Sequence, residues 1–339
     1  SVYNTAVGFQ AGTAVTTGVQ NTIVGGLAGD SLTDADFNVA VGVSALAGDT
    51  LGSRSTALGY FALSVQNFTT ATDVYNVAVG HGAGASVTTG LYNTLIGGLA
   101  GDALTDADEN VAVGQSALTT DTKGSRNVAV GQIALASQNF TTSTSSYNTG
   151  VGYAAGGAIT TGVNNTLIGA LTGDALTTGT RNVSVGYNNL STDTKGQNTT
   201  AIGYQALANQ NFTTATDTYN TAVGYNAGVS VTTGIQNTLI GGLVGDALTN
   251  AHNNISIGFG SLSTDTLGSA STALGTFALN AQNFTTATSS YNTAVGYNAG
   301  AGVTTGIENT IVGALAGDAF SDADYNVAVG SQALSQDTL

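Results

Sequence analysis

The stretch Asn4-Thr5-Ala6-Val7-Gly8 decides the fold, because close variants of it return nineteen times along the 339 residues of the chain. The closing glycines run from Gly8, Gly25, Gly42, Gly59 and Gly80 to Gly330 with spacings of 17, 17, 17 and 21 residues, so the larger period is 72. A short unit that cannot bury its own apolar face must stack on copies of itself. The spacing therefore predicts an all-β, parallel β-solenoid in which each unit forms one coil.

We name the four coils of one super-repeat a, b, c and d. Four residues after the closing glycine they carry Gly, Gly, Leu and Leu, at Gly12, Gly29, Leu46 and Leu63 in the first copy and at Gly300, Gly317 and Leu334 in the last. The super-repeat is therefore not a by-product of low complexity. We expect one continuous solenoid over 1–339, with units 1–72, 73–144, 145–216 and 217–288, a partial unit 289–339, and an origin in a longer chain.

Each motif alternates two kinds of side chain, as a strand does. The residues one and three before the closing glycine are Val, Ile, Leu or Thr, such as Val7 and Thr5, and the opposite face carries Ala6 and Asn4. A strand that is apolar on both faces is buried on both sides. We therefore expect the Ala face to pack against identical chains around a common axis, and a second short strand at Ala11, Ala28, Ala45 and Ala62.

The composition favours a surface fibre over an enzyme. Only 7% of the residues are charged, and the chain has 5 Lys and Arg but 20 Asp and Glu, which gives a net charge of −15. Such a charge argues against nucleic acid or anionic membrane as a partner. The chain has no Cys, so a thiol or Cys-based zinc site is excluded, and no apolar run is long enough to span a bilayer.

The motifs Asn-Thr-Ala-Val-Gly, Asn-Val-Ala-Val-Gly and Ser-Thr-Ala-Leu-Gly, each followed by two variable residues and Ala, resemble the head repeat of YadA-like trimeric autotransporter adhesins over the whole chain. They are similar also to repeats of trimeric phage tail fibres and related surface fibres. The resemblance implies a left-handed β-roll, a homotrimer, location on a cell surface or virion outside the cell, and a role in attachment. A tail-fibre shaft that binds a carbohydrate receptor is the alternative, and end-to-end stacking of the trimers is a further expectation.

An asparagine precedes most of the strands and predicts a structural ladder. Stacked amides about 4.8 Å apart can hydrogen-bond from coil to coil. The first members are Asn4, Asn21, Asn38, Asn76, Asn93, Asn110 and Asn127, whereas Ser55, Thr199 and Ser271 take the position in coil d. Flat Thr arrays suit ice, but Thr alternates with Val here, so ice binding is only a minor alternative.

Coil b carries the acidic turns. Three copies hold three carboxylates within seven residues, namely Asp30, Asp34 and Asp36, then Asp102, Asp106 and Asp108, then Asp318, Asp322 and Asp324. Such oxygen ligands could hold Ca²⁺. The other two copies read Asp174, Thr178, Thr180 and Asp246, Asn250, His252, so a metal needed for folding would be missing there. A solvated acidic turn is therefore favoured over a calcium site.

Coil d is four residues longer and carries Phe68, Phe140, Phe212 and Phe284 at intervals of 72. Surface loops on a rigid scaffold often carry recognition, so these loops are candidates for contacting a receptor. The favoured alternative is that each ring folds back as a plug over the long turn. The sequence Asn67-Phe68-Thr69 is also a glycosylation acceptor motif, in all four copies.

Catalysis finds no support in the residue pattern. Glu109 and Glu308 stand at unmatched places in the repeat, as do His81 and His252. A glycosidase needs two carboxylates at a fixed separation across a cleft. We therefore expect a structural or adhesive fibre, with no enzyme activity and no cofactor.

Overall fold

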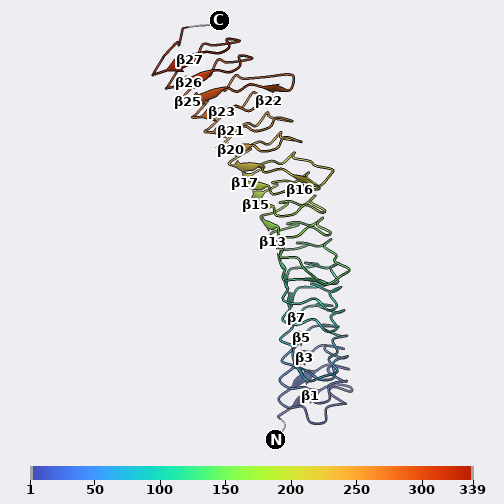
Figure 1. Cartoon of the computed structure of the whole chain (residues 1–339). Coiled ribbons are helices and arrows are strands. Elements are labelled where there is room, and N and C mark those ends of the chain that lie inside the picture. The colour runs from blue at the N-terminus through green and yellow to red at the C-terminus, as the bar shows by residue number, and fades with distance from the viewer. Residues whose placement is uncertain (1–2, 337–339) are drawn as a thin grey trace. The chain divides into compact units, whose positions relative to one another are not determined.

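The computed structural model describes residues 3–336 and divides the chain into two compact units, Ser1–Ala170 and Leu171–Leu339. Each unit consists of short strands and turns stacked in successive coils (Figure 1). Within residues 3–336 no helix has the length and apolarity needed to cross a bilayer. One unbroken solenoid over 1–339 stays a prediction, and the two units are described separately.

In unit 1, one parallel sheet takes a strand from every coil, and small two-stranded sheets join coil c to coil d. The main strands are β1 (Thr5–Val7), β2 (Thr22–Val24), β3 (Val39–Val41), β5 (Thr56–Leu58), β7 (Val77–Val79), β8 (Thr94–Ile96), β9 (Val111–Val113), β11 (Val128–Val130), β13 (Thr149–Val151) and β14 (Thr166–Ile168). The small sheets pair β4 (Gly52–Ser53) with β6 (Thr72–Asp73), and β10 (Gly124–Ser125) with β12 (Thr144–Ser145).

Unit 2 repeats this arrangement. Its main strands are β15 (Val183–Tyr187), β17 (Thr200–Tyr204), β19 (Thr221–Val223), β20 (Thr238–Ile240), β21 (Ile255–Ile257), β23 (Thr272–Leu274), β25 (Thr293–Val295), β26 (Thr310–Val312) and β27 (Val327–Val329). The small sheets pair β16 (Gly196–Gln197) with β18 (Thr216–Asp217), and β22 (Gly268–Ser269) with β24 (Thr288–Ser289).

The strands stack in register, so every residue lies beside the same motif position of the next coil. In the first pair Thr5 lies opposite Thr22, Ala6 opposite Ile23, and Val7 opposite Val24, in parallel orientation. Each motif is too short to bury a face alone, and this stacking supplies its neighbours. The predicted all-β parallel β-solenoid with 17-residue coils is confirmed.

The closing glycine of each motif, hereafter the strand glycine, is required by the stacking. At Gly114 the φ angle is +138°, and a Cβ atom placed there would lie 2.4 Å from the carbonyl oxygen of Gly131 in the next coil. L-residues with a side chain rarely adopt this backbone conformation. Glycine therefore returns at this position because the backbones of successive coils meet there.

The predicted orientation of the two strand faces is wrong. The Ala side chains lie inside the coil, where Ala40, Ala57 and Ala78 are fully buried, and the Val and Thr side chains point outward. A 17-residue coil is narrow, so its interior admits methyl groups and an occasional Ile or Leu at the strand. The Ala face therefore cannot be an interface between chains.

The predicted second strand is also wrong, because the chain turns after the strand glycine. Leu27 and Ser44 adopt the left-handed conformation, with φ of 58° and 55°, and the Ala that follows each of them points into the core. In the turn, the amide of Ala28 donates to the carbonyl of Gly25 over 3.3 Å. This turn allows a single coil to close.

Four residues after the strand glycine, coils a to d carry Gly, Gly, Leu and Leu. This pattern balances the size of that residue against the size of the residue three positions later, which shares the interior of the coil. Coil b pairs Gly29 with a buried Leu32, and a Cβ on Gly29 would lie 2.8 Å from Leu32 Cδ1. Coil c reverses the choice, with a buried Leu46 and the smaller, polar Asp49 three residues later. Close packing tolerates no surplus methylene groups, so each coil type keeps its own combination.

Gly114→Ala should lower the free energy of unfolding by about 2 kcal/mol or more, because the new methyl group meets the Gly131 carbonyl at a strained φ. The measurement is the urea midpoint followed by circular dichroism. The matched control is Gly98→Ala, since a Cβ on Gly98 would meet nothing within 4 Å. Equal midpoints for the two variants would contradict the role assigned to the strand glycine.

Candidate functional surfaces

Residues 3–336 enclose no pocket, so the candidate sites are rows of side chains that recur from coil to coil. The first row is the asparagine ladder. Asn21 and Asn38 each donate a backbone N–H to the Oδ1 of the asparagine one coil before, over 2.8 and 2.9 Å. Each Nδ2 donates to a backbone carbonyl 14 residues further along the chain, as from Asn21 to Ala35 over 2.8 Å.

In the ladder, the Asn side chains therefore bond to backbone groups of the chain and not only to one another. In the same way, the backbone N–H of Asn110 donates to Asn93 Oδ1 over 3.0 Å, and that of Asn127 donates to Asn110 Oδ1 over 3.0 Å. Asn4 and Asn76 accept in the same way from Asn21 and Asn93. The members from Asn21 to Asn309 are buried, so the ladder is a structural element of the interior edge of the sheet.

The acidic turns of coil b use their carboxylates mostly to hold neighbouring coils. Asp36 Oδ1 accepts the N–H of Val19 over 2.7 Å, and Asp34 Oδ1 accepts the Thr17 hydroxyl over 2.6 Å. The later copies repeat the backbone contact, from Leu91 to Asp108 and from Ile307 to Asp324, both over 2.8 Å. These turns are therefore held to the preceding coil a by hydrogen bonds.

The remaining members of the acidic turns have separate partners. Asp102 accepts from Thr119, Asp106 from Thr105, and Asp322 from Ser321. Asp30 and Asp318 each have a buried Oδ1 without a hydrogen-bond partner. Among residues 3–336, no three His, Asp or Glu side chains are grouped so as to hold a metal ion. Calcium binding at these turns stays a prediction.

The structure places the coil d phenylalanines inside the molecule. Phe68, Phe140, Phe212 and Phe284 are only 5 to 7% exposed. A Cβ on Gly124 would lie 2.9 Å from Cδ2 of Phe140, so the ring covers the small sheet of β10 and β12. This is the plug arrangement. The exposed part of the loop is its tip, Thr69, Thr70 and Ala71 in the first copy.

A buried carboxylate that sequence reasoning missed anchors each of these loops. Asp49 is fully buried, and its Oδ1 accepts the N–H groups of Gly52 and Phe68 over 3.1 and 3.0 Å. Its Oδ2 accepts from Gln66 Nε2 over 2.6 Å, and Gln66 Oε1 accepts from Asn76 over 2.9 Å. No Lys or Arg joins this cluster; hydrogen bonds alone compensate the buried charge.

The same cluster recurs in every described super-repeat, with Asp121 and Gln138, Asp193 and Gln210, and Asp265 and Gln282. The signal was available in the sequence, since an aspartate stands at this position in all five copies, the last being Asp337 outside the described residues. The second and third coil b acids vary between copies by comparison, whereas the first is aspartate in all five, at Asp30, Asp102, Asp174, Asp246 and Asp318. Burial raises the pKa of Asp193, although the hydrogen bonds from Gln210, Phe212 and Gly196 oppose the shift.

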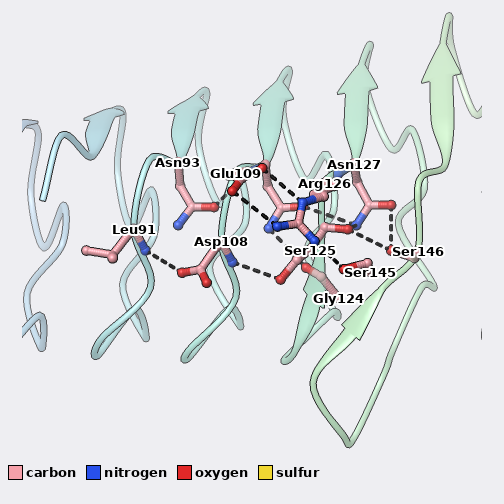
Figure 2. A network of polar contacts seen from close by, with 11 residues as sticks. Leu91, Asn93, Asp108, Glu109, Gly124, Ser125, Arg126, Asn127, Ser145 and Ser146 are labelled. Carbon is pink, nitrogen blue, oxygen red and sulfur yellow. Dashed lines mark hydrogen bonds and ion pairs between the residues drawn. The ribbon is translucent and has the colours of Figure 1, made fainter.

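Arg54 and Arg126 stand at the end of coil c, directly before the coil d motif. Figure 2 shows Arg126 between Glu109, whose Oε2 is 3.0 Å from Nε, and Ser145 of β12. The hydrogen bond and the charge of Glu109 keep the pKa of Arg126 above its ordinary value. Beside it, Asp108 Oδ1 accepts a hydrogen bond from the Leu91 N–H, and the Asp108 N–H donates to Ser125 Oγ over 3.0 Å. The charged groups thus lie beside the sheet and not on it.

The outward side chains of the main strands form what we call the sheet face, made of the residues one and three before each strand glycine. Every one of them is Thr, Val, Ile or Leu, without a single charge in a chain of net charge −15. Many are open to solvent, with Leu58 and Ile255 each 45% exposed. An uncharged face with exposed aliphatic side chains in most coils is a candidate interaction surface.

Aromatic side chains line the sheet face. In unit 2 the rings of Tyr187, Tyr204 and Tyr225 stack with centroids 5.5 and 5.4 Å apart. In unit 1 Tyr75 stacks on Tyr92 at 5.9 Å, on the opposite edge of the face. Stacked rings present their edges to solvent, so they extend the apolar face rather than form a flat platform for a sugar ring.

Comparison of the chain with protein-family models and with curated proteins gives no match in either case. The functional argument therefore depends on the geometry described above.

Asn93→Ala should lower the free energy of unfolding by about 2 to 4 kcal/mol, because it leaves the Asn110 amide and the Ala107 carbonyl without their buried partner. Chemical denaturation measures the change. Asn139→Ala is the control, since Asn139 is exposed on the coil d loop, and it should change the free energy by less than about 0.5 kcal/mol. A loss at Asn93 no larger than at Asn139 would show that the ladder contributes little.

Unit 2 should be more stable in mild acid than at neutral pH. Burial raises the pKa values of Asp174, Asp193 and Asp246, so the folded state holds protons that the unfolded state has released. Stability then falls as the pH rises through the raised pKa values. We expect a higher melting temperature at about pH 5 than at about pH 7.5.

The double substitution Asp174→Asn and Asp246→Asn should shrink this pH difference. The control Asp322→Asn removes one exposed carboxylate of the same unit and reports the effect of net charge alone. Melting temperatures that rise from about pH 5 to about pH 7.5 would contradict the assigned direction.

Proposed function

We propose that this chain is a rigid, self-associating segment of an extracellular fibre, with a structural or adhesive role and no catalytic one. The sheet face carries the proposal. It is uncharged in all nineteen motifs, the residue before each strand glycine is Val, Ile or Leu, and at least one outward side chain is exposed in most motifs and half-buried in the others, whereas the carboxylates stand on the turns. Selection for solubility alone would place charges there, so the face has the properties of a surface that another molecule covers.

A second copy of the chain is the partner that fits this face best. Two chains that each carry a net charge of −15 repel one another except where both surfaces are neutral. The repeat also offers the same side chains at every coil, so a copy can match the face along its length. The resemblance to trimeric adhesin heads favours three chains, located on a cell surface or virion and used for attachment.

A carbohydrate-binding fibre shaft is the second candidate. The observation in its favour is the row of coil d tips, where hydroxyl groups such as Thr69 and Thr70, and Thr213 and Thr214, are exposed once in every super-repeat. Such tips stand on loops that the buried Asp and Phe hold in place. The role would be receptor contact, while the sheet face still joins the chains.

Light scattering on the purified chain should give about three times the mass of one 33.4 kDa chain. The double substitution Val113→Lys and Val130→Glu should reduce the mass to that of a monomer. These residues face each other on β9 and β11, so the new charges pair within one chain yet must lose water when the face is covered.

The matched control puts the same two charges on the exposed coil d tip, as Thr142→Lys and Ser143→Glu. That variant should keep the wild-type mass, and all three proteins should share one circular dichroism spectrum. A wild-type chain that stays monomeric at micromolar concentration would overturn the proposed self-association.

A further inference from the structure

The residue directly after each strand glycine, which we call the flank position, has a fixed size in coils a and b and a variable size in coils c and d. In coil a it is always a ring, at Phe9, His81, Tyr153, Tyr225 and Tyr297. In coil b it is always Gly or Ala, at Gly26, Gly98, Ala170, Gly242 and Ala314. A projecting ring and a gap therefore stand side by side once in every 72 residues.

The fold of the chain itself does not require glycine at the coil b flank position. Gly26 and Gly98 lie outside the left-handed region, and a Cβ on either would meet nothing within 4 Å. The preceding strand glycines differ sharply, since a Cβ on Gly25 would lie 2.4 Å from the Gly42 oxygen. The missing side chains at Gly26 and Gly98 leave open space on the outside of the coil.

This open space has defined walls. Successive flank positions lie on neighbouring coils, as the hydrogen bonds from Leu27 to the Phe9 carbonyl and from Ser44 to the Gly26 carbonyl show. The notch at Gly26 therefore lies between Phe9 and Val43, which are 74% and 48% exposed. The notch at Gly98 lies between His81 and Gln115, both exposed, and beside the sheet face at Ile96.

We propose that the notches at Gly26 and Gly98 receive coil a rings from the flank positions of a second copy of this chain. Ring and notch repeat with the same period of 72 residues, so a copy set against the face in the matching position fills the notches at Gly26 and Gly98 at once. The uncharged sheet face beside the notches lets the two acidic chains approach. This inference rests on the proposed self-association and names the contact that aligns the chains.

The notch also explains why a four-coil period exists on the outside of the molecule. A uniform face would let two chains slide by one coil at little cost, whereas rings and notches fit only in steps of four coils, or roughly 19 Å. In unit 2 the chain partly fills its own notch, since a Cβ on Gly242 would lie 3.3 Å from Phe259 Cδ2. The aligning contact is therefore assigned to unit 1.

The test is sedimentation equilibrium of the full chain with Gly26→Phe and Gly98→Phe. Filling both notches should weaken association by about tenfold to hundredfold for each ring excluded, since a buried ring contributes binding on that scale. Gln132→Phe is the matched control, because it adds the same ring at the exposed coil d flank position, two coils after Gly98, where the first super-repeat already carries Tyr60. It should leave the dissociation constant unchanged.

A second variant approaches the contact from the other side and removes only exposed rings, by Phe9→Ala, His81→Ala and Tyr153→Ala. It should weaken association to a similar degree, and adding Gly26→Phe and Gly98→Phe to it should cause little further loss, as expected for groups that meet. Circular dichroism checks that each variant folds.

If the wild type self-associates and the two glycine variants associate as tightly, the notch assignment is wrong while the proposed function stands. If the wild type does not associate, both the notch assignment and the proposed self-association are wrong. A glycine variant that is weakened equally with and without the coil a rings would also overturn the contact, because the rings would then not be what the notches receive.

Discussion

The backbone contact at the strand glycines is the constraint on which the structure depends. Within each unit, every strand glycine that is followed by another lies so close to it that a single methyl group would overlap a carbonyl oxygen. The contact fixes the register of successive coils, and the register in turn brings Asn beneath Asn and Ala beneath Ala. The polar ladder and the methyl-lined core are consequences of that alignment.

Within this frame, the four coil types divide the interior between apolar and polar filling. Coils a and b fill the space with Val15 and Leu32 beside a glycine, whereas coils c and d use a leucine beside Asp49 and Gln66. The polar half is tolerated because both oxygens of the Asp49 carboxylate find donors from the backbone or from glutamine. The long coil d loop is held by the same groups, so the extra length is a structural element rather than an insertion.

Sequence periodicity was enough to predict the solenoid, the coil length and the asparagine ladder, because each depends on spacing alone. It could not decide which strand face is inside. Alternation shows that two faces exist, and both were apolar. The answer depended on the width of a closed coil, whose interior takes the methyl group of Ala40 in one coil and the side chain of Ile23 in the coil before it. Asp49 was overlooked for a related reason, since a carboxylate in a turn sequence is ordinarily solvated and only its recurrence in all five copies indicated burial.

The reach of the polar contacts has a consequence for how such a chain can change length. The bonds that close each Asp, Gln and Phe cluster join residues 3 to 19 positions apart, so no cluster extends beyond two adjoining coils. Gain or loss of 72 residues by recombination would leave every cluster intact. Loss of one 17-residue coil would set the wrong types against each other, with leucine crowding leucine or a carboxylate facing no glutamine. Chains related to this one should therefore differ in length by whole super-repeats of four coils.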